Sequence, residues 1–165
     1  MKFNNIKTER LLIRKLTEKD SSCMSLYRSL TEVAEFQSWE KFSEKEALKL
    51  IKEMASSDPS VAGKWFQFGI EHLVDDCLIG DVGFMNSDSD GKSWVGFTLD
   101  SKYWRQGLAS EAVAKIISYY QSFDISEVWA SIDPKNISSQ KLLGRLEFSL
   151  MDSQSDNLIF MKKLI

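Results

Sequence analysis

The chain has 165 residues, 43% of them hydrophobic and 27% charged, which is the balance of a globular protein long enough to bury a core without disulfides or metal. Twenty-one Lys and Arg against 24 Asp and Glu leave a formal charge of -3, so bulk attraction to nucleic acid or to an anionic membrane is not indicated. No run approaches the roughly 18 apolar residues of a membrane span and the N-terminus has no apolar secretory core, so we expect no membrane partner and a cytoplasmic location.

The first part of the chain predicts one strand followed by two helices. Residues 10–16, Arg-Leu-Leu-Ile-Arg-Lys-Leu, indicate the strand. Thr17, followed three residues later by Asp20, is a helix start, and apolar residues then recur at helical spacing as far as residue 30. A second helix is expected from Ser43, with Glu46 completing a capping box, and it stops before Asp58-Pro59-Ser60.

The middle of the chain changes to short runs rich in Phe, Trp, Val and Ile. These runs, at 65–71, 78–84 and 94–99, are separated by polar turn signals at 75–76 and at 88–91. The pattern predicts an antiparallel meander of three strands.

The last part alternates between helix and strand. We expect a helix from about Gly107, a strand at 127–132, a helix at 136–146 and a strand at 158–164, with an extra strand near Phe148. A helix between the 94–99 and 127–132 strands permits a parallel crossover, so the fold class is α+β with mixed pairing. Two prolines and eight glycines are scattered singly, without linker or repeat, so residues 1–165 are expected to form one domain.

The chemical signal is concentrated where the 94–99 strand gives way to the helix from Gly107. A short loop leading into a helix points free backbone N–H groups and the positive end of the helix dipole at one spot, which favours an anion. Arg105 adds a charge-assisted contact there. The alternative, of equal weight on spacing alone, is that Gly107 is only a turn residue before an amphipathic helix.

Four segments, in the same order along the chain, resemble the GCN5-related N-acetyltransferase (GNAT) family. Residues 104–109 align with its acetyl-CoA loop Gln/Arg-x-x-Gly-x-Gly/Ala, with Trp104 in the leading position. The longer run 103–112, Tyr-Trp-Arg-Gln-Gly-Leu-Ala-Ser-Glu-Ala, matches the branch of the ribosomal-protein N-terminal acetyltransferases (RimJ/RimL-like). The opening strand at 8–14, the central strand at 78–84 and the Asn-x-x-Ser helix entry at 133–139 agree with the same branch.

The resemblance implies a GNAT-type fold that binds acetyl-CoA as co-substrate in a gap between two splayed parallel strands, here 94–99 and 127–132. About four helices would flank its central, mostly antiparallel sheet. Backbone groups left unpaired by the splay would bond the pantetheine arm, and the turn after them would bind the pyrophosphate. The expected cofactor-binding residues are Phe97, Thr98, Leu99, Arg105, Gln106, Gly107, Leu108, Ala109, Ser110 and Asn136.

The resemblance also assigns a role to the helix entry at 136–139, with two departures from the family pattern. Many members place a tyrosine seven residues after the Asn, as general acid for the departing thiolate, but this chain has Leu143. The role therefore moves to Ser139, whose hydroxyl would stabilise the thiolate. Asn136 has a competing interpretation as a helix N-cap. The second departure is Glu147-Phe148, where the family usually has Gly-Phe.

The general base is less well defined by the sequence. Asp81 and Glu71, on two neighbouring strands, are the candidate catalytic carboxylates, each with the alternative of a solvated strand residue. Glu111 is interpreted as a stabiliser of the first helical turn. Phe36, Trp39, Trp65 and Phe66 are candidates for the acceptor pocket, with core packing as the alternative.

Metal and thiol chemistry have little support in the sequence. His72 is the single histidine, which leaves too little for a His-based zinc site or a Ser-His-Asp relay. Cys23 and Cys77 fit no metal spacing, so no metal is expected, and buried thiols are favoured over a disulfide.

The function expected from these features is transfer of an acetyl group from acetyl-CoA to a primary amine, directly and in a ternary complex. The acceptor is a protein N-terminal α-amine or a small-molecule amine. The alternatives are an aminoglycoside or polyamine acetyltransferase, a non-catalytic CoA-binding regulatory domain, and a nucleotide-binding module. Helices within 17–57, which should shape the acceptor cleft, carry charges of both signs. Exposed sheet edges also allow a homodimer.

Overall fold

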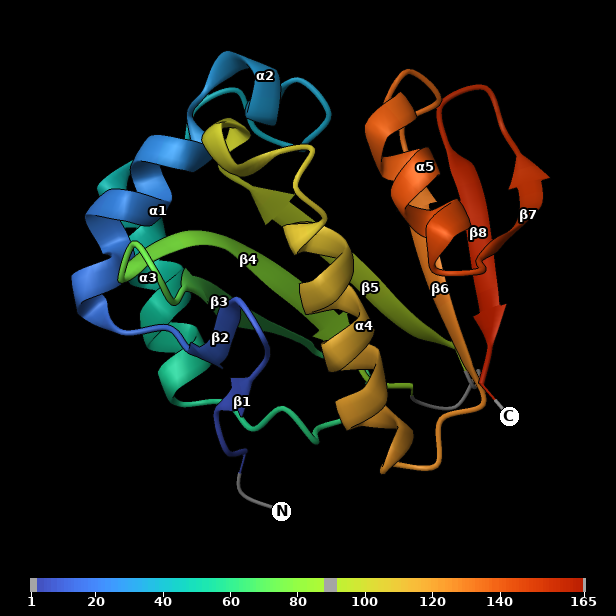
Figure 1. Cartoon of the computed structure of the whole chain (residues 1–165), viewed down its shortest axis with the longest axis horizontal. Coiled ribbons are helices and arrows are strands. Elements are labelled where there is room, and N and C mark those ends of the chain that lie inside the picture. The colour runs from blue at the N-terminus through green and yellow to red at the C-terminus, as the bar shows by residue number, and fades with distance from the viewer. Residues whose placement is uncertain (1–2, 88–91, 165) are drawn as a thin grey trace.

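The computed structural model describes residues 3–87 and 92–164, whose strands form one eight-stranded sheet with the order β1-β2-β3-β4-β5-β6-β8-β7 (Figure 1). The strands are β1 (Ile6–Lys7), β2 (Leu11–Lys15), β3 (Trp65–His72), β4 (Cys77–Met85), β5 (Ser93–Leu99), β6 (Glu127–Ile132), β7 (Ser149–Ser153) and β8 (Leu158–Lys163). The helices are α1 (Ser21–Arg28), α2 (Thr31–Ala34), α3 (Glu44–Ala55), α4 (Leu108–Gln121) and α5 (Ile137–Arg145), with 3₁₀ turns η1 (Glu18–Asp20) and η2 (Ser101–Tyr103).

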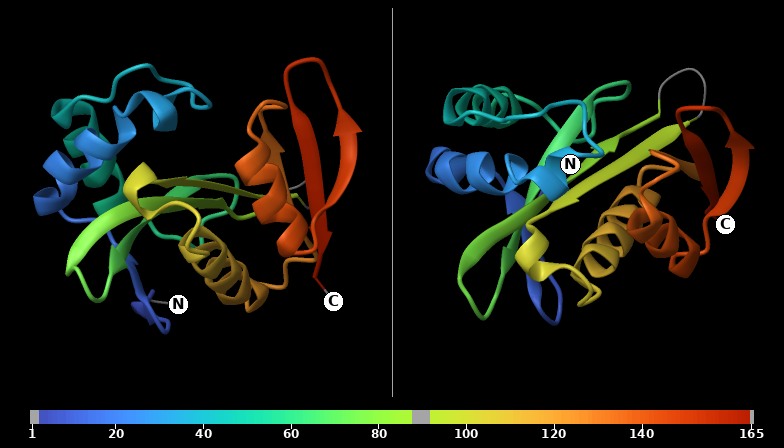
Figure 2. Two further views of the ribbon diagram at one scale, coloured as in Figure 1. Left: turned by 45° about the horizontal axis from the view of Figure 1, so that its top comes forward. Right: turned by 90° about the horizontal axis from the view of Figure 1, so that it is seen from above.

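Helices cover both faces of the sheet. In the view from above, α1 and α3 lie on one side of the strands, and α4 and α5 lie on the other (Figure 2). The main core forms where α4 packs on the sheet, and there the ring of Tyr120 stacks on Phe84 with a centroid distance of 3.9 Å. A smaller core under α1 and α3 includes Met24, Tyr27 and Ile51, all nearly inaccessible to solvent. None of the helices in 3–87 and 92–164 is long and apolar enough to cross a membrane.

The expected order of elements is confirmed, and two elements are added. The predicted antiparallel meander is present as β3-β4-β5, and the extra strand near Phe148 is β7. The capping box at Ser43 and Glu46 is formed, with Ser43 N donating to Glu46 Oε2 at 2.6 Å. β1 and α2 were not predicted, because two strand residues and four helical residues are too short to show a period. The turn predicted at 88–91 lies outside the described residues.

The parallel pair β5 and β6 separates after two residues. Their register contains only Ser93 opposite Val128 and Trp94 opposite Trp129, after which the strands diverge (Figure 1). On its other edge β5 pairs with β4 along nearly its whole length, from Met85 opposite Trp94 to Gly80 opposite Leu99. The second half of β5 therefore has one edge without a strand partner, as the splayed arrangement requires.

Glu147 adopts a backbone conformation that suits the glycine usual in the family. Its φ of 65° is left-handed, and the carbonyl of Leu143 accepts from Phe148 N at 3.0 Å, closing the end of α5. Glu147→Gly should raise the free energy of unfolding by about 0.5–1 kcal/mol, since a left-handed residue with a side chain is strained. Urea denaturation measures this, with Glu147→Gln as the control that keeps the strain. Equal stabilities for the two variants would contradict the explanation.

Candidate active site

The turn between η2 and α4 has the geometry of an anion site. Arg105 and Gly107 both have left-handed backbones, with φ of 61° and 76°. Gly107 is the N-cap of α4, and because it has no side chain, no cap accepts from the first helical amides. The first N–H groups of this 14-residue helix are therefore free. Together with the left-handed turn at Arg105 and Gly107, they form a concave surface of donors that suits a phosphate.

The residues just before β2 bind this turn and the helix that follows it. Arg10 Nη1 donates to the carbonyl of Gln106 at 2.7 Å, and its Nε donates to Glu111 Oε2 at 2.8 Å. Thr8 Oγ1 donates to the other oxygen of Glu111. Burial alone would raise the pKa of the Glu111 carboxyl, but the hydrogen bonds from Thr8 and Arg10 outweigh it and hold that pKa below its ordinary value. Glu111 thus links the first turn of α4 to the N-terminal segment through Thr8 and Arg10. This contact is additional to the stabilisation of the first helical turn expected from the sequence.

The free edge of β5 presents alternate residues to the gap. Asp100 N donates to the carbonyl of Ile79 on β4 at 2.8 Å. Backbone groups of successive strand residues point to opposite edges, so Thr98 also faces β4, and a side chain at Gly80 would collide with the Thr98 carbonyl oxygen. The expectation that the Thr98 backbone faces the gap is therefore corrected: Thr98 offers only its side chain.

The same alternation turns the backbones of Phe97 and Leu99 toward the gap. Trp104 Nε1 donates to the Leu99 carbonyl at 2.8 Å, so that acceptor is already bonded. What remains for a ligand is the N–H of Leu99 and both polar groups of Phe97. These groups run along the divergent edge as an unpaired strand edge would.

The far side of the gap is formed by the start of α5. Asn136 Oδ1 accepts from Ser139 N at 3.1 Å, which confirms the N-cap interpretation of Asn136. Ser139 and Asn136 both line the pocket as well, so capping and ligand contact are compatible. Leu143, in the place of the family's tyrosine, is fully buried in the core.

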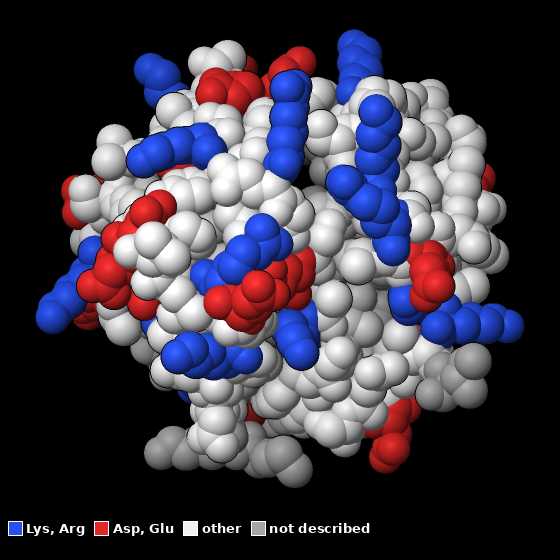
Figure 3. All heavy atoms as spheres, in the orientation of Figure 1, with Lys and Arg blue, Asp and Glu red and all other residues white. Residues whose placement is uncertain are grey.

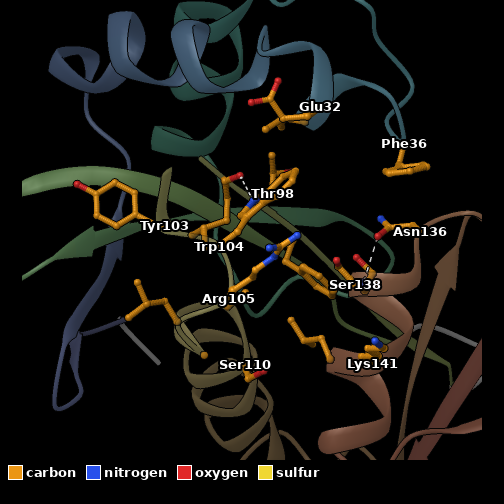
Figure 4. Close-up of a pocket in the computed structure, with 18 of the residues that line it drawn as sticks. Glu32, Phe36, Thr98, Tyr103, Trp104, Arg105, Ser110, Asn136, Ser138 and Lys141 are labelled. Carbon is orange, nitrogen blue, oxygen red and sulfur yellow. Dashed lines mark hydrogen bonds between the residues drawn. The ribbon is translucent and has the colours of Figure 1, made fainter. Parts of the chain in front are cut away.

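One pocket of about 490 Å³ brings most of the expected residues together (Figure 4). Of the expected cofactor-binding residues, Gln106 does not line the pocket and the other nine do. The lining residues are Glu32, Val33, Phe36, Gln37, Phe97, Thr98, Leu99, Tyr103, Trp104, Arg105, Gly107, Leu108, Ala109, Ser110, Asn136, Ser138, Ser139, Lys141, Leu142 and Arg145. Lys and Arg side chains lie on two sides of the hollow on this face, with Asp and Glu side chains close to them, although the net charge is negative (Figure 3).

Asp81 is not among the lining residues. Its fully buried carboxylate forms an ion pair with Arg28 Nη2 at 2.6 Å and accepts from Gln67 Nε2 at 2.7 Å and from the Tyr27 hydroxyl. Burial, followed by the charge of Asp81, raises the pKa of Tyr27 well above its ordinary value, so its hydroxyl stays a donor. Asp81 is neither a solvated strand residue nor a neighbour of the cleft, but the centre of a buried polar network.

Arg28 links this network to the segment that follows α2. Its guanidinium carbon lies 4.6 Å from the ring centroids of both Trp39 and Phe42, and its carbonyl accepts from Trp39 Nε1 at 2.8 Å. Phe36 lies three residues before Trp39 in the same segment, and its side chain lines the cavity. The other three aromatic candidates for the acceptor pocket do not line it: Trp39, Trp65 and Phe66.

Glu71 is also outside the pocket. Its Oε2 pairs with Arg14 Nε at 2.6 Å, and Arg14 pairs with Asp20 Oδ2 at 2.8 Å. The hydrogen bond from Arg14 and that from the Thr17 amide outweigh burial and lower the pKa of Asp20. The structure therefore places both carboxylates proposed as general bases in ion pairs away from the cavity. The acid that lines the pocket, Glu32, was missed because a four-residue helix leaves no periodic signal.

Free amides at the start of α4, a splayed parallel strand pair and a pocket that joins them are the arrangement expected of a GNAT-type acyltransferase. The family model described as "Acetyltransferase (GNAT) domain" matches residues 10–149, so the chain belongs to this family of acetyltransferases. Over 143 residues it is 33% identical to the uncharacterized N-acetyltransferase p20 of Bacillus licheniformis, covering 86% of this chain and 80% of that protein.

Two solved structures illustrate the shared fold. RimL, a ribosomal L7/L12 alpha-N-protein acetyltransferase in complex with coenzyme A, superposes with a TM-score of 0.83 at 16% identity, covering 98% of each chain. The ribosomal-protein-S5-alanine acetyltransferase of Vibrio fischeri superposes with a TM-score of 0.81 at 18% identity, covering 98% of this chain and 97% of that one. At these identities the likeness concerns the fold.

Proposed function

We propose that the protein transfers the acetyl group of acetyl-CoA directly to a primary amine. The observation that carries the proposal is that the uncapped amides of the Gly107 turn and the free edge of β5 open into the same pocket. A diphosphate attached to a flexible amide-bearing arm matches that combination. The acceptor is a protein N-terminal α-amine or a small-molecule amine, and the fold shared with two ribosomal-protein acetyltransferases supports the former.

The chain's own groups suggest how the substrate is held. The diphosphate binds the first amides of α4 with Arg105 beside it. The amide-bearing arm bonds Phe97 and Leu99 as an added strand would, and a free N–H of β5 polarises the thioester carbonyl. In the transfer, the amine nitrogen attacks the carbonyl carbon, the new C–N bond forms and the C–S bond breaks. The nitrogen gives its proton to solvent water, because neither Asp81 nor Glu71 lines the pocket, and the sulfur leaves as a thiolate that the Ser139 hydroxyl stabilises.

Ser139→Ala is expected to lower turnover while leaving acetyl-CoA affinity nearly unchanged. Removing one donor to a charge that develops in the transition state costs about 10²-fold in rate. Steady-state release of free thiol measures turnover, and titration calorimetry measures affinity. Ser138→Ala is the matched control, because its hydroxyl lines the same pocket one position earlier. Unchanged turnover in Ser139→Ala would remove Ser139 from the mechanism.

The proposal itself is tested by titrating the purified protein with acetyl-CoA and with ATP, followed by a free-thiol assay over a panel of amines. Selective binding of acetyl-CoA with thiol release that depends on an amine is the expected result. Binding without release from any amine would favour the non-catalytic CoA-binding domain. Equal competition by ATP would favour the nucleotide-binding module.

A further inference from the structure

The charges around the pocket are separated by sign. Arg105 on the η2–α4 turn, and Lys141 and Arg145 on α5, are its cationic lining residues. Glu32 on α2 is the acidic residue among those that line the cavity within 3–87 and 92–164. Figure 4 shows Glu32 on the α2 side of the cavity and Lys141 on α5 at the far end, with Arg105 between them. Phosphates are therefore favoured at one end of this pocket and a cation at the other.

The mixed charges of residues 17–57 do not extend into the cavity. From this part of the chain the pocket receives Glu32, Val33, Phe36 and Gln37, so its contribution combines one negative charge with apolar and amide surface. The basic side chains of the same region line none of it. The acceptor side of the pocket is consequently acidic, which the sequence of these helices did not reveal.

The Glu32 carboxylate is held in position and ionised. Its Oε1 accepts from Ser101 Oγ at 2.7 Å, which connects α2 to η2. Its own backbone amide, and then the Ser101 hydroxyl, lower the pKa of the carboxyl, so it is charged at neutral pH. In the described part of the chain no Lys or Arg forms an ion pair with it.

We propose that Glu32 binds a second, non-reacting cationic group of the acceptor, so that preferred acceptors carry two positive charges. The inference rests on the proposed function and names its substrate class. The hydrogen bonds that lower the pKa of Glu32 make its carboxylate a weak proton acceptor, so it is better suited to hold a cation than to deprotonate the attacking nitrogen. An ionised carboxylate at the pocket wall therefore serves a different nitrogen of the same molecule.

Two sources share this chemistry, a diamine and a peptide with a basic side chain next to its N-terminus. Matched probes distinguish them: 1,4-diaminobutane against n-butylamine, and the peptide Ala-Lys-Ala against Ala-Gln-Ala. Each pair keeps the reacting amine and changes only the second charge. The variants are Glu32→Gln and, as control, Glu35→Gln, an exposed glutamate three residues further on that does not line the pocket.

Binding of each probe is measured by calorimetry in the presence of CoA, and acetylation by release of free thiol. We expect the wild type to favour the dicationic member of one pair, and Glu32→Gln to weaken binding of that member about three- to fivefold, the upper range for a charge pair at an exposed carboxylate such as Glu32. Binding of the monocationic member, acetyl-CoA affinity, and binding of either member to the Glu35→Gln variant should change by less than about twofold.

Equal effects of Glu32→Gln on both members of each pair, or the same effect from Glu35→Gln, would overturn the proposal, as would a wild type with no preference. These outcomes are separate from failure of the proposed function. That failure appears as absent thiol release from the wild type with every probe, whereas the role of Glu32 is read from binding alone.

Discussion

Replacing Asp81 with alanine is expected to lower the free energy of unfolding by about 3–5 kcal/mol, because it leaves the charge of Arg28 buried without a partner. The Arg28 side chain is only 6% exposed and that of Asp81 is inaccessible. Gln67 and Tyr27 would lose their acceptor in the same change. Urea denaturation followed by circular dichroism measures the difference, and Asp156→Ala, on the exposed turn before β8, should change it little.

A double variant separates the buried charge from lost packing. Arg28→Met together with Asp81→Ala removes both charges, so it should be more stable than Asp81→Ala alone. Two results would show that the pair is not the buried ionic contact seen here. One is a double variant whose loss of stability equals the sum of the losses from Arg28→Met and Asp81→Ala, and the other is a loss below about 1 kcal/mol for Asp81→Ala alone. Because the Arg28 guanidinium also lies over the rings of Trp39 and Phe42, the double variant loses those contacts and should loosen the segment that carries Phe36.

The fold followed from the sequence where local signals are strong. The apolar face of α4, the capping box of α3 and the runs of Phe, Trp, Val and Ile in β3 to β5 each lie within a short window, and each predicted element is present. The splayed pair was expected from the resemblance, and its extent is visible only in the register of β5 and β6. Short elements such as α2 were not predicted, because a helix of about one turn is too short to show a hydrophobic repeat in the sequence.

The cofactor end of the pocket was likewise predictable, because its residues are consecutive. Gly107 and its neighbours form one turn, and the helix entry at Asn136 is one motif. The carboxylates were not predictable, since their partners lie far away along the chain: Asp81 meets Arg28, 53 residues before it, and Glu71 meets Arg14, 57 residues before it. A sequence shows which acids occupy strands, but not which of them the fold neutralises.

Gly107→Asp is expected to weaken acetyl-CoA binding by about 100-fold or more, equivalent to the loss of two amide–phosphate hydrogen bonds of about 1.5 kcal/mol each. The substituted side chain would bring a negative charge to the start of α4, where the diphosphate is proposed to bind. The fold should tolerate the change. Aspartate is among the residues that accept a left-handed backbone, and a Cβ at this position has only Arg10 Nη2 within 4 Å, at 3.5 Å.

Gly107→Asn is the matched comparison, because asparagine has the same shape, accepts the same backbone and carries no charge. Calorimetric titration of both variants with acetyl-CoA separates blocking of the turn, which they share, from repulsion of the phosphates, which only aspartate causes. We expect asparagine to weaken binding less than aspartate, with the difference shrinking as salt is added, since screening reduces charge repulsion. Wild-type affinity in both folded variants would mean that the diphosphate does not bind at this turn. Equal weakening at every salt concentration would mean that the turn binds through shape alone.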